Sequence, residues 1–209
     1  MILYHYWRSS CSWRVRWALA LKNLSFETVA VNLLEKNALS DKLSNKNSML
    51  QVPSLEIVAG QVLCDSVAII EWLDETYPDT SPLLPKDPLA RQKCRELTQL
   101  IASGTQPLQN LPVLSFIESL GGSRQSWAKD VISKGLAAYE SKLAHWQTEG
   151  PLSFGPAPTI ADLCVVPQIY NALRFDVDLS KTPRLKNLYS HARSLPSCVK
   201  AAPEAWENI

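Results

Sequence analysis

The chain has 209 residues, of which 46% are hydrophobic and 20% charged, and its 21 basic and 20 acidic residues leave a net charge of +1 at pH 7. A chain of this length buries enough apolar surface for one large domain or two small ones without help from disulfides or metals. The balanced charge argues against a nucleic-acid-binding face. No stretch approaches the roughly 18 apolar residues of a membrane helix, so we expect neither nucleic acid nor a membrane as a partner.

Five cysteines are scattered along the chain, and no two of them form a CxxC pair. Their odd number and their spacing argue against a disulfide framework and against a zinc site. The three histidines have no metal-ligand spacing either, so we expect no bound metal. Scattered, unpaired cysteines are typical of a reducing compartment, and the first residues lack the basic and apolar regions of a signal peptide. We therefore expect a cytoplasmic protein.

Residues 2–34 predict a strand, a helix and a second strand. Residues 2–6 form a short apolar run that is typical of a buried strand. Ser9 or Ser10 can then cap a helix over residues 11–22. Residues 26–34 are rich in β-branched and aromatic side chains, and they predict a strand that runs parallel to the first after the helical crossover. The expected unit is βαβ.

The following residues predict a hairpin and another helix. Residues 35–49 are polar and have only a weak helical pattern, so we expect an irregular, mobile segment. Residues 54–57 and 61–63 are strand-like and flank a turn, which predicts an antiparallel hairpin. Asp65 or Ser66 can cap a helix that ends at the Tyr-Pro pair downstream. The region therefore has the order βαβ-ββα, an α/β arrangement with a mixed four-stranded sheet.

A proline-rich stretch at residues 78–88 predicts a boundary between two domains, 1–80 and 89–209. No strand is expected in the second domain, which should be an all-α bundle. Thr159 and Asp162 have the spacing of a capping box and are expected to start one of its helices. The predicted helices cover residues 89–116, 125–147, 159–173 and 184–194.

The run "WRSSCSWRVRW" at residues 7–17 places serines and a cysteine at the predicted start of the first helix. Unpaired backbone N–H groups and about half a positive charge at a helix start stabilise an anion above Ser9 to Cys11. A hydroxyl of Ser9 or Ser10 can also donate a hydrogen bond to a thiolate and so lower its pKa. Simple helix capping remains the alternative explanation for one of the serines, and an inert, partly buried thiol remains the alternative for Cys11.

The order of elements and three motifs together resemble the zeta class of the cytosolic glutathione transferases, whose typical member is maleylacetoacetate isomerase. The resemblance covers nearly the whole chain and weakens after about residue 181. It implies a thioredoxin-like N-terminal domain, an all-helical C-terminal domain and a homodimer, and it assigns no role to the ending "CVKAAPEAWENI". The motifs are "RSSCSWRVR" at 8–16, "QPLQN" at 106–110, and "TIADLCVVPQ" at 159–168 followed by "NALRFDVDL" at 171–179.

The resemblance implies a glutathione-dependent cis-trans isomerase that converts maleylacetoacetate to fumarylacetoacetate in tyrosine and phenylalanine catabolism. The thiolate adds to the activated double bond, the bond rotates, and elimination regenerates the cofactor, glutathione. A maleylpyruvate isomerase and a zeta-type glutathione transferase or dehalogenase are alternatives with the same fold. Cys11 favours the maleylacetoacetate type over the maleylpyruvate type. A non-catalytic glutathione-binding module is a further alternative.

In the resembled family the first serine of the run activates the glutathione thiol, which maps onto Ser9, while Ser10 and Cys11 assist at the same helix start. Glutathione, and not Cys11, supplies the attacking sulfur. The retention of Ser9 and Cys11 together with the other glutathione positions argues against a non-catalytic module.

The resemblance places the remaining glutathione contacts at two further positions. Pro53 is cis in the superfamily, so that the backbone of Val52, beside Gln51, pairs with the cysteinyl part of glutathione; an ordinary trans proline is the alternative. Ser66 and Asp65, at the next helix start, hold the γ-glutamyl end. Zeta members often carry Gln at the position of Asp65, and pure capping is the alternative for that residue.

The substrate of this family carries two carboxylate-like ends, so the site needs cations. By the family pattern Arg14, Arg8, Arg174 and Gln106 are candidates for binding these ends, because an arginine can bind a carboxylate through two hydrogen bonds. Only one arginine of the "RVR" triplet can face the site, because positions two apart point to different sides of a helix. Gln106 and Asn110 are also candidates for binding glutathione, and Asn110 could orient a water or contact the second subunit's glutathione. A solvated surface charge is the alternative for each arginine.

Overall fold

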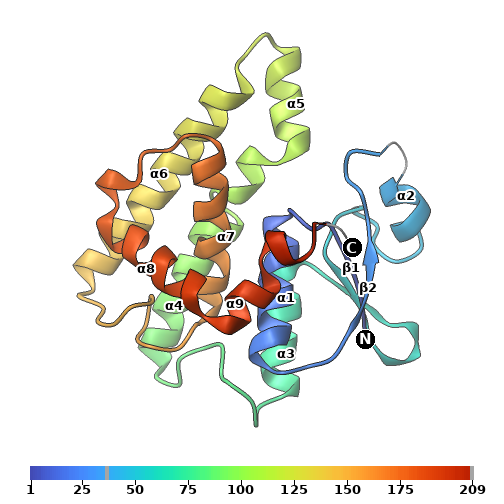
Figure 1. The fold of residues 1–209 in the computed structure, drawn as a ribbon, viewed down its shortest axis with the longest axis horizontal. Helices are drawn as coiled ribbons and strands as arrows, with labels where there is room; N and C mark the ends of the chain where they lie inside the picture. Colours follow the sequence, from blue (N-terminus) through green and yellow to red (C-terminus); the bar gives the residue numbers. More distant parts are fainter. Residues whose placement is uncertain (36–37, 208–209) are drawn as a thin grey trace. The chain divides into compact units, whose positions relative to one another are not determined.

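The computed structural model describes residues 1–35 and 38–207 and divides the chain into two compact units (Figure 1). The first unit contains Met1–Leu83 together with Leu195–Ile209, and the second contains Leu84–Ser194. Among the described residues, none of the helices combines the length and the apolar character needed to cross a membrane.

The first unit contains the expected mixed four-stranded sheet, in the order β2-β1-β3-β4. β1 pairs in parallel with β2, with Ile2 opposite Glu27, and antiparallel with β3, with Leu3 opposite Leu55. β3 and β4 form the predicted hairpin. The strands are β1 (Ile2–His5), β2 (Glu27–Ala30), β3 (Ser54–Glu56) and β4 (Val62–Cys64).

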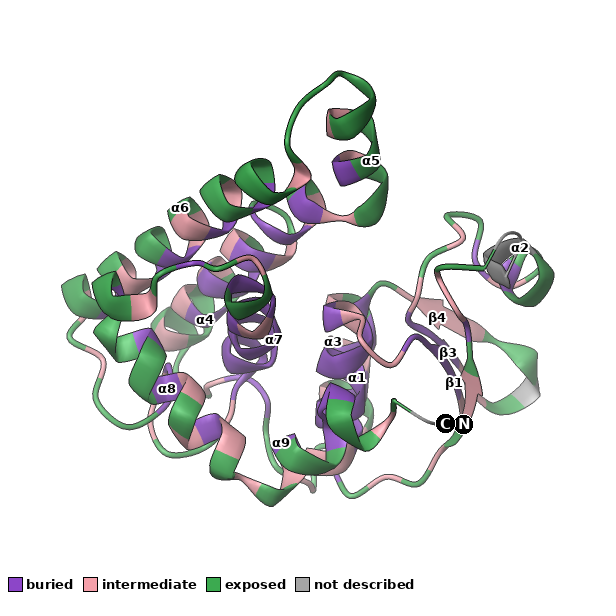
Figure 2. Cartoon of the chain, turned by 45° about the horizontal axis from the view of Figure 1, so that its top comes forward, coloured by how far each residue is buried: buried purple, intermediate pink, exposed green. Residues whose placement is uncertain are grey.

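Two helices, α1 (Ser10–Leu21) and α3 (Ser66–Thr76), pack against each other beside the sheet, as both views show (Figures 1 and 2). The alternation of side chains along β1 separates Leu3 from Tyr4. Leu3 is fully buried, and Tyr4 packs in a cluster with Val31 and with Leu43 of α2. The sheet therefore has an apolar layer on each face, as expected for an α/β unit.

The segment expected to be irregular contains a short helix, α2 (Ala38–Leu43). Its last residue, Leu43, is fully buried, and this burial stabilises a turn of helix that the weak sequence pattern did not predict. Residues 36–37 of the same expected segment lie outside the described part. The hairpin turn is a single turn of 3-10 helix, η1 (Val58–Gly60), with Gly60 at a φ of 74°.

The second unit is helical in its described elements, as expected. The predicted capping box starts α7: the backbone N–H and the hydroxyl of Thr159 both donate to Asp162 at 2.8 Å. Figure 2 shows α7 as the most buried helix of this unit. The elements are α4 (Pro88–Ala102), η2 (Gln106–Gln109), α5 (Leu111–Ser119), α6 (Arg124–His145), α7 (Ile160–Arg174), η3 (Leu179–Lys181) and α8 (Pro183–Ser194).

The single helix expected over residues 89–116 is wrong, because this stretch contains α4, the 3-10 turn η2 and α5. Pro107 lies inside the turn and Pro112 lies in the first turn of α5. A proline removes a backbone donor and clashes with the preceding turn, so each one starts a new element and does not continue the old one.

The end of the chain differs from the expected division at 89–209. From Leu195 onward the chain clusters with the first unit, where α9 (Pro196–Ala201) packs on α1 (Figure 1). The indole N–H of Trp17 donates to the hydroxyl of Ser197 at 3.1 Å. A helix of six residues shows one buried face in its sequence, but that pattern does not reveal which domain buries it.

A buried lysine joins the last turns of α1 and α3. Lys22 Nζ lies 3.0 Å from a carboxylate oxygen of Asp74, and the lysine is only 2% exposed. The same ammonium donates to the carbonyl of Tyr77 at 3.3 Å, to the hydroxyl of Thr80 at 2.9 Å and to the carbonyl of Ser81 at 3.2 Å. These contacts satisfy the charge inside the unit and fix the spacing of the two helices.

We expect Lys22→Met to lower the free energy of unfolding by about 3 kcal/mol, because removing one partner of a buried pair leaves the other without compensation. Urea denaturation measures the loss. Lys134→Met is the matched control, since Lys134 pairs with Asp130 at 2.7 Å on an exposed face of α6, and such pairs contribute little. Equal losses in the two variants would contradict the account.

Candidate active site

Ser9 is the N-cap of α1, as one of the two sequence alternatives predicted. Its backbone is extended, with φ −66° and ψ 123°, and its hydroxyl oxygen accepts a hydrogen bond from the backbone N–H of Ser12 at 3.2 Å. A serine hydroxyl accepts and donates at the same time. The proton of the Ser9 hydroxyl can therefore be given to an acceptor above the helix start while the cap remains in place.

Ser10 and Cys11 form the first turn of α1. Ser10 is 7% exposed, Cys11 is half-buried, and the Cys11 thiol is not in a disulfide. The first backbone N–H groups of a helix have no acceptor within it. Together with the positive end of the helix dipole, the N–H groups of these two residues are suited to an anionic ligand.

Arg14 lies on the side of α1 that faces α3. Its Nη1 donates to the hydroxyl oxygen of Ser66 at 3.1 Å, and Arg14 and Ser66 are 1% and 4% exposed. This contact brings together two predicted site residues that are 52 positions apart. Because Ser66 accepts from Arg14, its own hydroxyl proton is directed elsewhere, at the start of α3.

The peptide bond between Val52 and Pro53 is cis, as the family resemblance implied. The residues before it are held by Asn47, whose amide nitrogen donates to the carbonyl of Gln51 at 2.8 Å and to the hydroxyl of Ser54 at 3.2 Å. Val52 is half-buried and Gln51 is exposed. The backbone at Val52 therefore enters β3 in a fixed conformation.

Asp65 caps α3 and has a left-handed backbone with a φ of 67°. One of its carboxylate oxygens accepts from the backbone N–H groups of Val67 at 2.9 Å and Ala68 at 3.2 Å. This oxygen therefore caps the helix, and capping was the alternative role considered for Asp65. The Asp65 side chain is exposed, so a carboxylate charge remains accessible beside Ser66.

In the second unit Gln106 and Asn110 are paired, because the side-chain amide of Gln106 donates to the side-chain oxygen of Asn110. Their turn lies close to α6 at a glycine. A Cβ on Gly135 would lie 3.0 Å from the Cβ of Thr105 and closer still to the rest of that side chain. Only glycine lets the backbone of α6 approach Thr105, and this approach sets the position of Gln106.

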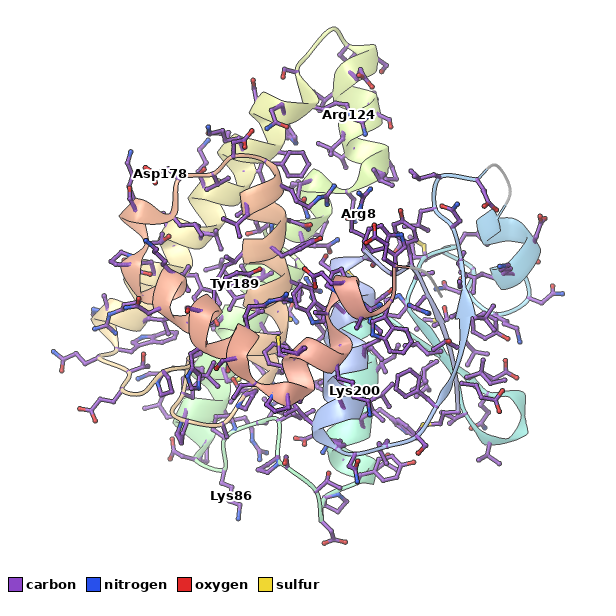
Figure 3. All side chains as sticks on the ribbon, viewed as in Figure 1. Arg8, Lys86, Arg124, Asp178, Tyr189 and Lys200 are labelled. Carbon is purple, nitrogen blue, oxygen red and sulfur yellow. The ribbon has the colours of Figure 1, made fainter. Side chains whose placement is uncertain are left out.

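The two remaining arginine candidates have separate surroundings. Arg8 is half-buried, and its guanidinium lies 5.2 Å from the centre of the Trp7 ring; Figure 3 labels it at the loop that enters α1. Arg174, at the end of α7, is exposed and donates to the side-chain oxygen of Asn171 at 3.2 Å. These contacts leave both cations with exposed surface.

Arg16 of α1 and Lys22, the C-cap of α1, are two basic residues to which the sequence assigned no function. Both are buried, and both bind groups far away along the chain. No local pattern predicts these contacts, because their partners at Ala201 and Ser81 lie 185 and 59 positions away.

The comparisons with known proteins point to one family. Residues 3–81 match the family model described as glutathione S-transferase, N-terminal domain. A protein of Caenorhabditis elegans named probable maleylacetoacetate isomerase is 46% identical over 204 residues, which cover 97% of this chain and 93% of that protein.

Solved structures that are similar to this chain belong to the same family. The maleylacetoacetate isomerase of Anaeromyxobacter dehalogenans 2CP-1, with glutathione bound in its active site, is 42% identical and has a TM-score of 0.87 over 97% of this chain and 94% of its own. Another structure of that protein holds dicarboxyethyl glutathione and citrate. A holo maleylpyruvate isomerase described as a bacterial zeta-class glutathione S-transferase is 39% identical, with a TM-score of 0.93 and 98% of both chains covered.

The contribution of the Ser9 cap to stability can be measured independently of any activity. We expect Ser9→Ala to lower the free energy of unfolding by about 1 kcal/mol and Ser9→Gly to lower it by only a few tenths, because glycine is tolerated at an N-cap and alanine is not. Urea denaturation of both variants measures the difference. Equal losses would mean that the cap does not stabilise α1.

Proposed function

The chain belongs to the zeta class of the glutathione transferases, and on that premise we propose that it is a glutathione-dependent cis-trans isomerase that converts maleylacetoacetate to fumarylacetoacetate. The observation that carries the proposal is the start of α1, where Ser9 keeps a hydroxyl proton available beside unpaired backbone N–H groups. The relatives named maleylacetoacetate isomerase, one of them with glutathione in its active site, support the same reading.

The residues of the first unit fit glutathione by their donor chemistry. The start of α1 offers a hydroxyl and N–H groups to a thiolate, and the cis bond before Pro53 presents backbone groups of Val52. At the start of α3, Ser66 keeps a hydroxyl proton and Asp65 an exposed carboxylate. These groups match a thiol, a peptide backbone and an amino acid end, which are the parts of glutathione.

When bound, glutathione supplies the sulfur nucleophile whose reversible addition lets the substrate double bond rotate. Ser9 donates its hydroxyl hydrogen bond to this sulfur, and such a bond to a charged acceptor stabilises the thiolate. Arg8, Arg174 and Gln106 are proposed to bind the carboxylate-like ends of the substrate. Arg14, the fourth candidate, is 1% exposed and donates to Ser66, so it holds the start of α3 and does not face the substrate. Cations beside developing negative charge also lower the barrier. Asn110, paired with Gln106, positions that amide.

A maleylpyruvate isomerase is the second candidate, because the zeta-class enzyme of that name superposes on this chain with a TM-score of 0.93. The two substrates share the maleyl end and differ at the other end, so the same thiolate chemistry serves both. A conjugating or dehalogenating glutathione transferase would use the same helix start on a substrate with a leaving group.

The resemblance to the superfamily supports a homodimer, and the five cysteines, none of them in a disulfide, support a reducing, cytoplasmic location. Figure 3 shows the side chains of the described residues, and among these no group of three or more His, Cys, Asp or Glu could hold a metal ion.

Substrate choice is tested by isomerisation assays on maleylacetoacetate and on maleylpyruvate, each with and without glutathione. We expect turnover of maleylacetoacetate only with glutathione, and slower turnover of maleylpyruvate. Faster turnover of maleylpyruvate would favour the second candidate. Glutathione binding with turnover of neither substrate would rule out the isomerase proposal.

The source of the nucleophile is tested by comparing Ser9→Gly with Cys11→Ala. Ser9→Gly removes the hydroxyl but largely keeps the cap, so we expect kcat/KM to fall about 10- to 100-fold, the loss of one hydrogen bond to a charged group. Cys11→Ala should lose less. The reverse order would make Cys11 the nucleophile.

A further inference from the structure

The C-terminal segment covers Arg16 on α1. The Arg16 Nε donates to the carbonyl of Ala201 at 2.9 Å, and its guanidinium lies 5.4 Å from the centre of the Trp206 ring. Trp206 in turn stacks on Phe26, with ring centres 5.9 Å apart and 17° between the planes. Its indole N–H donates to the carbonyl of Lys200, a residue labelled on α9 in Figure 3, at 2.9 Å.

Arg16 is a buried cation. It is 1% exposed, and its hydrogen bonds in the described part of the chain all go to neutral acceptors. Burial lowers the pKa of Arg16 to about 9, so the side chain remains charged at neutral pH. A buried charge without a counter-ion is costly unless every donor is used. The carbonyl of Ala201 and the face of Trp206 contribute to that compensation.

The other end of the guanidinium holds the loop that leads into Ser9. Arg16 Nη2 donates to the carbonyl of Trp7 at 2.8 Å, and Nη1 donates to the carbonyl of Tyr6 at 3.4 Å. The same Tyr6 carbonyl accepts the backbone N–H of Ser9 at 3.1 Å. One planar side chain thus connects the C-terminal segment to the turn that sets the backbone of Ser9.

His5 completes this connection from β1. Burial, together with the nearby Arg16 charge, lowers the pKa of His5 to about 4, so the imidazole is neutral at pH 7. Arginine can only donate, so His5 Nδ1 accepts from Arg16 Nη1 at 3.1 Å. The His5 ring also meets the Trp206 ring edge to face, with centres 5.2 Å apart.

A cavity of about 270 Å³ lies beside this contact, lined in part by Arg16, Leu24, Phe26, Lys200 and Trp206. Its size allows several waters. If the indole were removed, water from this cavity would hydrate the guanidinium, and hydration would compete with the carbonyls of the loop for its donors.

We propose that Arg16, backed by the C-terminal segment through Trp206 and Ala201, is a positioning residue that fixes the loop at Tyr6 and Trp7 and thereby the hydroxyl of Ser9. The inference rests on the proposed glutathione site. It gives the ending of the chain a function in thiol activation at the opposite end of the sequence. Arg16 touches no substrate in this account and acts only through the loop.

The test replaces Trp206 by Leu, which keeps apolar volume but has no aromatic face, and by Phe, which keeps the ring. Arg16→Lys keeps the charge but loses the planar fork that reaches several carbonyls. The readouts are the pKa of the bound glutathione thiol, followed by thiolate absorbance against pH, and kcat and KM for glutathione.

We expect Trp206→Leu and Arg16→Lys to raise the thiol pKa by about one unit and to lower kcat about tenfold. The KM for glutathione should change less than about twofold, because Val52 and Ser66 are untouched. Trp206→Phe should restore most of both values. Trp146→Leu is the matched control: Trp146 is also half-buried, and Lys93 and Lys142 lie over its ring in the second unit.

An unchanged thiol pKa and kcat in Trp206→Leu and Arg16→Lys would overturn the positioning role, even if their melting temperatures fall. Equal effects of Trp206→Leu and Trp146→Leu would also overturn it, since general destabilisation would then explain both. If the unmodified chain fails to bind glutathione, the proposed function fails and this inference fails with it. Normal binding and a low thiol pKa in the unmodified chain leave the proposed function standing whatever the variants do.

Discussion

The structure of the first unit depends on the way α1 is held by three buried basic side chains. Arg14 binds the hydroxyl at the start of α3, and Lys22 binds the carboxylate and carbonyls near the end of α3. Arg16 binds the loop before the helix. Each cation is costly to bury unless polar groups surround it, so the contacts of Arg14 with Ser66, of Arg16 with the loop and of Lys22 with Asp74 favour one position of α1. These contacts therefore fix the position of the N-terminus of α1.

The fixed position of the α1 N-terminus is needed for its proposed chemistry. A cap and an end dipole occur on most helices, and they stabilise an anion only if the ligand meets them at the correct distance. Here Ser9 both caps α1 and keeps a proton to donate. Arg14 connects α1 to Ser66 at the start of α3. The starts of the two helices therefore keep a fixed separation, as is needed to bind the two ends of one extended ligand. The half-buried thiol of Cys11 lies at the same turn without being required as the nucleophile.

Local patterns predicted the parts of this unit that depend on local physics. Alternation and β-branching predicted the strands, and polar residues predicted caps at Ser9 or Ser10 and at Asp65 or Ser66, because these signals act within a few residues. Arg16 contacts a carbonyl 185 positions away, and no short window contains such a partner. The same reason explains why the ending at residues 195–207 could not be assigned to the first unit. The break at Pro107 and Pro112 could have been predicted from the two prolines. The helical pattern of residues 89–116 was given more weight, and a single helix was predicted.

The two units carry different shares of the proposed chemistry. In the proposal, sulfur activation rests on Ser9 in the first unit, while the arginine candidates for the substrate are Arg8 of the first unit and Arg174 of the second. The central claim is that the start of α1 activates a sulfur that glutathione supplies. The most direct test is a pH titration of thiolate absorbance in the Cys11→Ala protein saturated with glutathione. The absorbance of the glutathione-free protein is subtracted at each pH. The account predicts a bound thiol pKa at least about one unit below that of free glutathione, and a value equal to that of free glutathione would contradict it.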